Sequence, residues 1–425
     1  MFKWWFGITL WKRVLGALVL GIGFGLLVQQ SMGDGAVAFL EAYVQPFGDI
    51  FIALIRMMIV PLIFTTLVAG VVAMRQPAKL GTLGVMTIGL YLITTFFANV
   101  IGLVFGTIMR PGDGASEALA GATPEAISQE RPSGWDQILD IIQNPAAAMA
   151  EANILAIIFF AVLFGVGILL AGDKGESVGK FFESASEAVL KVTAIIMETA
   201  PFGVFALISY ATVAYGIEAF QSIFWLILTV YLGLLTHMLL IYGGLIKLVL
   251  RLPLIRFFRG IFDAQAVAFS TSSSSATLPV TITNARRNLG VKKGVAASVL
   301  PLGATINMDG TALYLGILAL FTAQAFGIDL TFANYVMIAI TAAVVSIGAA
   351  GIPSASLFLL ATVLSTFGAS PEQIALVVGF ILPVDRIMDM ARTVVNVTGD
   401  AAVATSVAKW EGELDEEVFR DPATI

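Results

Sequence analysis

The chain has 425 residues, of which 58% are hydrophobic and only 12% are charged, and its mean hydropathy is +0.93. Soluble domains carry about 25% charged residues, so this composition excludes an ordinary soluble protein and is typical of an integral membrane protein. The net charge is −6, and no basic patch with interleaved aromatic residues suggests a nucleic acid as a partner.

Residues with reactive side chains are few. The chain has no cysteine, and His237 is its only histidine, which excludes disulfides, thiol nucleophiles and Cys/His metal sites. A Ser-His-Asp triad could use only His237, which lies in an apolar run and is interpreted as a core or interfacial histidine. Because no nucleophile–base pair is visible, the sequence does not indicate an enzyme.

Six apolar segments of spanning length occupy the first 250 residues. Lys12 and Arg13 precede the first, and residues 36–38 resemble a signal-peptide cleavage site, but the apolar segments that follow favour an uncleaved first helix. Lysine and arginine concentrate in alternate connections, so the positive-inside rule places the N-terminus in the cytoplasm. The predicted spans lie near 14–30, 46–74, 83–109, 152–171, 188–214 and 222–250.

The second half contains two segments that predict hairpins rather than spans. Residues 260–285 hold a serine cluster between two basic flanks, which predicts a re-entrant hairpin from the cytoplasmic side. Residues 334–366 are interrupted at 348–354 and have almost no basic flanks, which predicts a hairpin from the outside. Between the hairpins, an apolar span over 294–326 is broken at 307–311. Paired hairpins and broken helices are typical of inverted-repeat secondary transporters.

The last predicted span, about 372–409, carries many ionisable side chains. At about 100° per residue, five polar residues share an arc of roughly 80°: Asp385, Asp389, Arg392, Asn396 and Asp400. Ionisable groups in a span cost about 2.5–3.5 kcal/mol each and are tolerated where they face a cavity or a partner. An ion-pair ladder through Asp389 and Arg392 would explain only one pair. We therefore interpret the arc as the lining of a binding site.

Two other segments supply polar groups within the membrane. Asn-Met-Asp-Gly-Thr (307–311) offers a carboxylate, an amide and, where the helix unwinds, carbonyl oxygens suited to Na⁺. Residues 272–275, all serine, would be a linker in solvent, but in an apolar hairpin their amides and hydroxyls can bind a carboxylate. Arg392 can pair with a second carboxylate, and Asp389 with an ammonium group. A ligand with one ammonium and two carboxylates is an acidic amino acid.

Four motifs in chain order carry a family resemblance: Ser-Ser-Ser-Ala-Thr-Leu-Pro (273–279), Asn-Met-Asp-Gly-Thr (307–311), Gly-Ile-Pro (351–353) and Asp-Met-Ala-Arg-Thr-Val-Val-Asn-Val-Thr-Gly-Asp (389–400). They resemble the glutamate transporter family of dicarboxylate/amino acid:cation symporters, which includes archaeal aspartate transporters and animal excitatory amino acid transporters. The resemblance covers nearly the whole chain. It implies an all-α polytopic membrane protein with eight transmembrane helices and two re-entrant helical hairpins. It also implies a homotrimer in the inner membrane, with both termini cytoplasmic.

The resemblance further implies a static scaffold and a transport domain that slides across the bilayer like an elevator. The scaffold would comprise residues 1–80 and 111–215, including an extracytoplasmic loop over 111–150. The transport domain would comprise residues 81–110 and 216–425, with its hairpins over about 258–288 and 333–367.

The substrate site implied by the resemblance combines one ammonium partner with partners for two carboxylates. Asp389 would hold the amino group, Arg392 the side-chain carboxylate, and Asn396 with Ser274 the α-carboxylate. The full set of implied substrate residues is Ser273, Ser274, Thr311, Ile352, Asp389, Arg392, Thr393 and Asn396.

Three sites for co-transported Na⁺ are implied in the same way, and no organic cofactor. The first would use Gly303, Asn307, Asn396 and Asp400. The second would use backbone oxygens of Thr305, Met308, Ser346, Ile347 and Ala349. The third would use Tyr91, Thr94, Thr95, Asn307 and Asp309.

The chain also departs from the family that it resembles. Ser272 stands where some archaeal members carry an arginine, and Met390 lies near the position where animal members carry one. Here the extra arginine is Arg386, beside Asp385, and its role stays open. Leu315 occupies the position of a glutamate that animal members use in proton coupling.

The function implied is Na⁺-coupled import of L-aspartate or L-glutamate. Alternatives within the family are proton-coupled symport, and transport of C4-dicarboxylates or neutral amino acids. Arg392 argues against neutral amino acids, and Asp389 argues against dicarboxylates that lack an amine. A different class of protein, an anion channel or a membrane sensor on the same scaffold, is a further alternative.

Overall fold

The computed structural model describes residue 8 and residues 10–73, 77–115, 142–151, 153–216, 219–347 and 355–421. These residues are helical apart from their connections and one isolated bridge between Val291 and Leu414. By length and composition, four of the described helices could cross a membrane, or five if one bent pair counts as a single span. The described part of the chain is therefore all-α, as predicted, and membrane-spanning.

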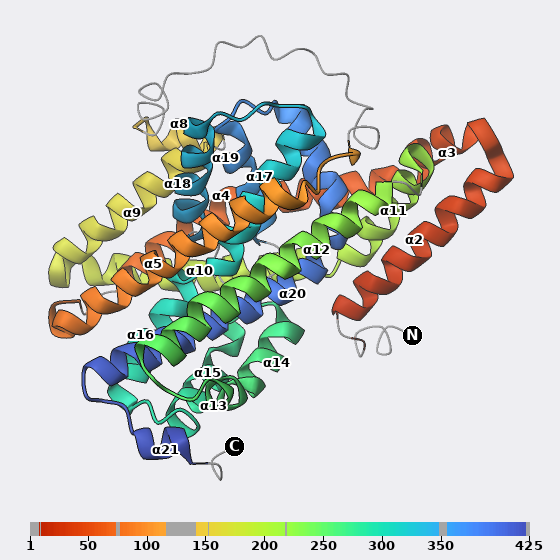
Figure 1. Ribbon diagram of the computed structural model, residues 1–425. Helices are drawn as coiled ribbons and strands as arrows, with labels where there is room; N and C mark the ends of the chain where they lie inside the picture. The colour runs from red at the N-terminus through yellow and green to blue at the C-terminus, as the bar shows by residue number, and fades with distance from the viewer. Residues whose placement is uncertain are drawn as a thin grey trace.

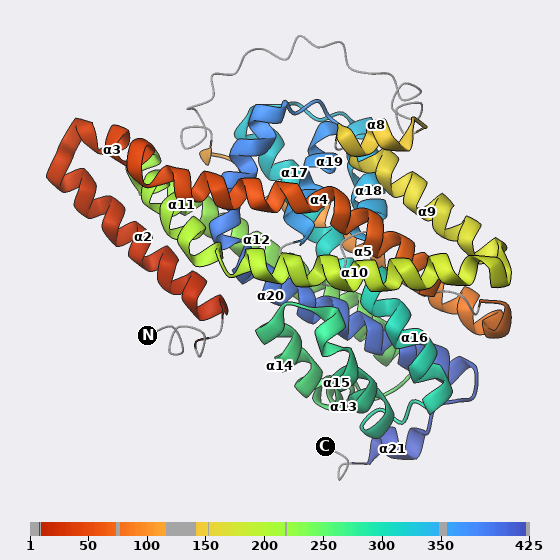
Figure 2. The ribbon, with the colours of Figure 1, turned by 180° about the vertical axis from the view of Figure 1, so that it is seen from behind.

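The helices of the first half pack into one group. They are α2 (Leu10–Met32), η1 (Gly33–Gly35), α3 (Ala36–Tyr43), α4 (Gln45–Ala73), α8 (Pro145–Ala150), α9 (Ile154–Leu170), η2 (Gly172–Gly175), α10 (Glu176–Met197) and α11 (Ala200–Tyr215). α11 packs on α2 and α4, and α9 and α10 pack on α4 (Figure 2). Gly25 of α2 allows the close approach of α11, because a Cβ atom there would meet the side chain of Thr212.

One predicted span differs from the structure. The sequence predicts a single span over 188–214, whereas the structure has α10 and α11, bent by 48° at Glu198 and Thr199. Pro201 lies in the first turn of α11. A proline is tolerated there but disfavours continuing the preceding helix, which accounts for the break.

The helices of the second half pack together with α5. They are α5 (Pro77–Met109), α12 (Ala219–His237), the π-helical turns η3 (Met238–Tyr242) and η4 (Leu245–Val249), α13 (Leu254–Gly260), α14 (Phe262–Thr271), α15 (Ser274–Arg287), α16 (Lys293–Ile306), α17 (Asp309–Ala325), α18 (Phe332–Ile347), α19 (Ala355–Ser365), α20 (Pro371–Trp410) and α21 (Glu416–Arg420). α20 runs through this group and contacts α12, α14, α15, α16, α17 and α19 (Figure 1).

Two helix pairs lie at opposite ends of this group (Figures 1 and 2). α14 and α15 pack together across a turn at Ser272, which has a positive φ of 52°, and Ser273 caps α15 by accepting a hydrogen bond from the Ala276 amide. α18 and α19 also pack together, and their connection, 348–354, lies outside the described residues. The serine cluster therefore forms the turn between α14 and α15, and the re-entrant course of this pair stays a prediction.

The predicted interruption at 307–311 is also confirmed. α16 ends at Ile306 and α17 begins at Asp309, with Asn307 and Met308 outside helical geometry. Nearly every residue of α17 is buried, against α5 on one side and α20 on the other. The helix break therefore lies inside the protein, where its free backbone groups can be satisfied by neighbouring helices.

The C-terminal segment folds back on the ends of η4 and α15. The Asp415 amide donates to the Gly290 carbonyl at 2.9 Å, and Phe419 is fully buried. Lys409 donates to the Leu250 carbonyl at 2.6 Å and pairs with Glu416 at 3.0 Å. This segment therefore ties the ends of several second-half helices together.

We expect the attachment of the C-terminal segment to weaken in acid. The hydrogen bond from Lys409 holds the pKa of Glu416 below its usual value of 4.5, so the stabilisation is present above 4.5 and is lost as pH falls through the lowered pKa. Exposed ion pairs contribute about 0.2–1 kcal/mol, so protection of 413–421 against hydrogen exchange should fall by less than about fivefold. In Glu416→Gln, protection of this segment should no longer change with pH, once the pH dependence of the chemical exchange rate itself has been corrected for. A variant with the wild-type pH profile would contradict the role of Glu416.

Candidate functional site

A fully buried guanidinium forms the centre of the polar arc on α20. Nη2 of Arg392 lies 2.8 Å from Oδ1 of Asp389 and 3.0 Å from Oδ1 of Asp385. Its guanidinium carbon lies 3.7 Å from the ring centroid of Tyr314, whose hydroxyl donates to Oδ1 of Asp385 at 2.6 Å. The i,i+3 pair that the sequence allowed is therefore present. Two carboxylates and an aromatic face hold the cation in place.

The remaining donors of Arg392 have no partner in the part of the chain that the structure describes. Nε and Nη1 are buried and form no hydrogen bond within the described residues. A buried, unsatisfied donor costs about 1–3 kcal/mol, and more when it is charged. Such a cost is typical of a functional site, and a carboxylate ligand would supply the missing acceptors.

Arg386 approaches the other oxygen of Asp389. Its Nη1 lies 3.8 Å from Oδ2 of Asp389, and its Nη2 donates to the carbonyl oxygen of Thr271 at 3.2 Å. Arg386 is 7% exposed, and its Nε has no hydrogen-bond partner among the described residues. The arginine whose role the sequence left open thus joins α20 to the turn between α14 and α15.

The other predicted substrate residues that the structure describes are also buried. Thr393 donates to the Asp389 carbonyl oxygen at 2.8 Å, and Oδ1 of Asn396 accepts from the Gly310 amide at 2.8 Å. Ser273, Ser274 and Thr311 are buried at the starts of α15 and α17. No direct hydrogen bond joins them to Arg392 within the described residues, and Ile352 lies outside those residues.

The first predicted sodium set comes together where the helix break meets α20. Nδ2 of Asn307 donates to Oδ1 of Asp400 at 3.0 Å and to the Asn396 carbonyl oxygen at 3.2 Å. A Cβ atom on Gly303 would overlap both Oδ1 of Asp400 and the Tyr91 hydroxyl. Oδ1 of Asn307 is buried without a hydrogen-bond partner in the described chain. The Asp400 carboxylate and the Asn396 carbonyl oxygen thus meet at the amide nitrogen of Asn307, beside Gly303.

The third predicted set adjoins the first. Thr95 donates to Oδ1 of Asp309 at 2.6 Å, and Thr94 donates to the Tyr91 carbonyl oxygen at 3.1 Å. The Tyr91 hydroxyl donates to the Val299 carbonyl oxygen at 3.1 Å. All of these side chains are buried, so α5 supplies hydroxyl groups to the same interior as the helix break.

The second predicted set is described only in part. Thr305 and Met308 lie at the end of α16 and in the break, while Ser346 and Ile347 end α18, which contacts α16. Ala349 lies outside the described residues. The set is therefore placed on neighbouring helices, without further geometry.

The donor atoms of these sets suit an alkali cation. The described residues contain no group of three or more His, Cys, Asp or Glu side chains that could hold a metal ion. Hydroxyl, amide, carbonyl and isolated carboxylate oxygens instead predominate, and these are the ligands that hard cations prefer.

Three aromatic or imidazole groups at the site were not predicted. Tyr314 covers Arg392, and both His237 and Tyr242 contact Asp309: Nε2 of His237 lies 3.2 Å and the Tyr242 hydroxyl 2.7 Å from Oδ2. His237 is buried, as the sequence suggested, but its ring faces a carboxylate. Nothing in the local sequence marks these contacts, because each joins residues far apart in the chain.

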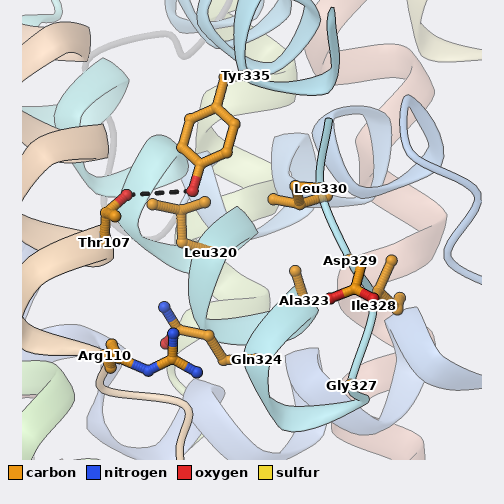
Figure 3. Close-up of a pocket in the computed structure, with 10 residues that line it drawn as sticks. All are labelled: Thr107, Arg110, Leu320, Ala323, Gln324, Gly327, Ile328, Asp329, Leu330 and Tyr335. Atoms are coloured by element: carbon orange, nitrogen blue, oxygen red, sulfur yellow. Dashed lines mark hydrogen bonds between the residues drawn. The ribbon is translucent and has the colours of Figure 1, made fainter. Parts of the chain in front are cut away.

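A surface cavity of about 270 Å³ lies elsewhere (Figure 3). It is found near the ends of α5 and α17, where the Thr107 and Tyr335 hydroxyls lie 3.2 Å apart and Arg110 lines the wall. None of the predicted substrate or sodium residues lines it. The candidate site is therefore the buried cluster along α20.

Comparison with known proteins places the chain among symporters. The model of the sodium:dicarboxylate symporter family matches residues 10–410. The proton/sodium-glutamate symport protein of Bacillus subtilis is 36% identical over 414 residues, 96% of this chain and 93% of that protein. The proton/glutamate-aspartate symporter of Escherichia coli is 34% identical over 95% of this chain and 93% of its own length. A C4-dicarboxylate transport protein of Azorhizobium caulinodans is 33% identical over 96% and 90%.

Proposed function

This chain belongs to the sodium:dicarboxylate symporter family, and we propose that it imports the acidic amino acids L-aspartate and L-glutamate together with Na⁺. It is a transporter and not an enzyme. The observation that carries the proposal is Arg392, a buried guanidinium whose Nε and Nη1 have no partner within the described residues. Relatives named as glutamate and glutamate-aspartate symporters support the same substrate class.

The chemistry of the site supports an amino acid with a second carboxylate. The free donors of Arg392 suit a carboxylate, which would compete with Asp389 for the guanidinium and leave Asp389 to pair with the substrate ammonium. Asn396, Ser274 and Thr311 would complete the polar contacts. A substrate without the second carboxylate would leave Arg392 unsatisfied, a penalty that selects against neutral amino acids.

Sodium coupling rests on the oxygen-rich clusters near the helix break. Two buried carboxylates there accept hydrogen bonds from neutral donors: Asp400 accepts from Asn307, and Asp309 accepts from Thr95. A buried carboxylate without a cation is costly, so a bound Na⁺ would offset part of its desolvation. The cation would thereby stabilise the same α20 surface that binds the substrate.

The larger architecture is proposed from the family resemblance. The chain would have eight spans and two re-entrant hairpins, with residues 1–80 and 111–215 as scaffold and the rest as an elevator-type transport domain. It would assemble as a homotrimer in the inner membrane, with both termini cytoplasmic. The opposite placement of the α14–α15 and α18–α19 pairs supports two hairpins of opposite orientation (Figure 1).

A C4-dicarboxylate carrier is the second candidate, because a relative of that name is 33% identical. Competition against labelled L-aspartate uptake in proteoliposomes separates the two. L-Glutamate in 100-fold excess should block uptake, whereas succinate and L-serine should not. If succinate competes as strongly as L-glutamate, the dicarboxylate assignment replaces ours.

Asp389→Asn gives a second test between an amino acid carrier and a dicarboxylate carrier. Removing the negative charge should reduce L-aspartate uptake by at least about tenfold, because the ammonium loses a charged partner. Succinate has no ammonium group, so any succinate uptake should change much less. Equal loss for both substrates would contradict the role of Asp389 as the ammonium partner.

A further inference from the structure

Asp309 is held by three hydrogen-bond donors, one each from α5, α12 and η3. Its Oδ1 accepts from Thr95 of α5 at 2.6 Å, and its Oδ2 is contacted by the Tyr242 hydroxyl at 2.7 Å and by Nε2 of His237 at 3.2 Å. A carboxylate offers about four lone-pair positions. With Oδ2 occupied twice and Oδ1 once, the remaining acceptor position is on Oδ1.

A π-helical turn brings two of these donors together. His237 and Tyr242 are five residues apart, so in an α-helix at about 100° per residue they would lie roughly 140° apart and could not meet one carboxylate. The chain instead forms η3, Met238–Tyr242, directly after His237. A π turn pairs residues i and i+5, and the two rings meet edge to face with centroids 4.8 Å apart. Such turns are rare and are frequently found at functional sites.

The surroundings of Tyr242 extend this cluster to the neighbouring cation set. His237, Tyr242 and Asp309 are each fully buried. A Cβ atom on Gly399 would overlap the Tyr242 hydroxyl and Nδ2 of Asn307, so α20 approaches this hydroxyl closely. The Tyr242 hydroxyl therefore lies between the Asp309 carboxylate and the Asn307–Asp400 pair.

We propose that His237 and Tyr242 are positioning residues of the cation site: held together by the π turn, they fix Asp309 so that Oδ1 is presented to Na⁺. The inference rests on the proposed sodium coupling and adds two residues to it. Since a carboxylate only accepts, the imidazole donates from Nε2, and a neutral ring with its hydrogen on that atom is sufficient. The two residues act through Asp309 and touch neither substrate nor ion.

The test is the Na⁺ dependence of L-aspartate uptake by the full-length protein in proteoliposomes. Tyr242→Phe removes one hydroxyl and should raise the Na⁺ concentration for half-maximal uptake about tenfold, the effect expected for losing a hydrogen bond to a charged group. His237→Leu should act in the same direction. The maximal rate at saturating Na⁺ should stay within about threefold, because the substrate contacts are intact. His237→Gln, whose amide can donate, should restore part of the loss.

A matched control is available on α12, the helix that carries His237. Tyr231 of α12 donates its hydroxyl to the Ile387 carbonyl oxygen at 2.8 Å rather than to Asp309. Tyr231→Phe makes the same chemical change and should leave the half-maximal Na⁺ concentration unchanged. Na⁺-induced thermal stabilisation without substrate gives a second readout, since a ligand that binds the folded state stabilises it.

The outcomes separate this inference from the proposed function. If wild type responds to Na⁺ and both Tyr242→Phe and His237→Leu match it, sodium coupling stands and the positioning role is overturned. If Tyr231→Phe shifts the Na⁺ dependence as much as Tyr242→Phe, the effect is structural and the role is likewise overturned. If wild type shows no response to Na⁺ in either readout, sodium coupling fails and this inference fails with it.

Discussion

Arg392→Ala is expected to lower uptake of L-aspartate and L-glutamate by at least about 100-fold. The Arg392 guanidinium pairs with Asp389 through Nη2 and keeps two charged donors, Nε and Nη1, without a partner among the described residues. A hydrogen bond to a charged group contributes about 1.5–3 kcal/mol, and two such donors are removed together. The measurement is initial uptake of labelled substrate into proteoliposomes at saturating Na⁺.

Folding has to be controlled in this experiment, because the alanine variant leaves Asp385 and Asp389 without their buried cation. Removing one partner of a buried pair destabilises by about 3–5 kcal/mol. Arg392→Lys keeps the charge and should fold, but its compact ammonium cannot reproduce the planar fork. We expect it to transport with an affinity at least about tenfold weaker. Uptake at normal affinity in either variant would contradict the assignment, and a conductance that persists without uptake would favour a channel.

Gly303→Ala is expected to weaken the Na⁺ dependence of L-aspartate uptake strongly. Its new Cβ atom would overlap Oδ1 of Asp400 and the Tyr91 hydroxyl, two groups of the proposed cation sites. Neither atom belongs to the far end of a freely moving chain, because both side chains are buried. The methyl group would therefore displace the oxygens that bind Na⁺. We expect the Na⁺ concentration for half-maximal uptake to rise at least about tenfold.

Gly294→Ala is the matched control for this substitution. Gly294 lies on the same helix, α16, and a Cβ atom there would meet nothing within 4 Å. The control should therefore transport like wild type. Equal Na⁺ dependence in the two variants would show that Gly303 does not border a cation site.

The sequence was most informative where local rules apply. The polar arc on α20 follows from helical spacing alone, and the structure places both Asp385 and Asp389 in contact with Arg392. The break at Asn307 and Met308 and the turn at Ser272 follow from polar and glycine-containing runs inside apolar segments. The bend at Glu198 and Thr199 was missed, although Pro201 marks it, because the apolar segment on either side reads as one span.

The rest of the candidate site depends on packing between distant segments. Tyr314 covers Arg392 from another helix, and Arg386 reaches the Thr271 carbonyl oxygen 115 positions away. No residue type predicts the π turn after His237, because a π turn is a change in backbone register and not in composition. His237 was expected to be a core histidine, and only the fold shows that its ring faces Asp309.

The central claim is tested most directly by uptake of labelled L-aspartate into proteoliposomes, with an imposed Na⁺ gradient compared with an imposed H⁺ gradient. We predict uptake against a concentration gradient when Na⁺ is directed inward, and none when only H⁺ is. Uptake driven by H⁺ alone would contradict sodium coupling while keeping the substrate assignment. No uptake under either gradient would contradict the assignment of acidic amino acids as the substrate.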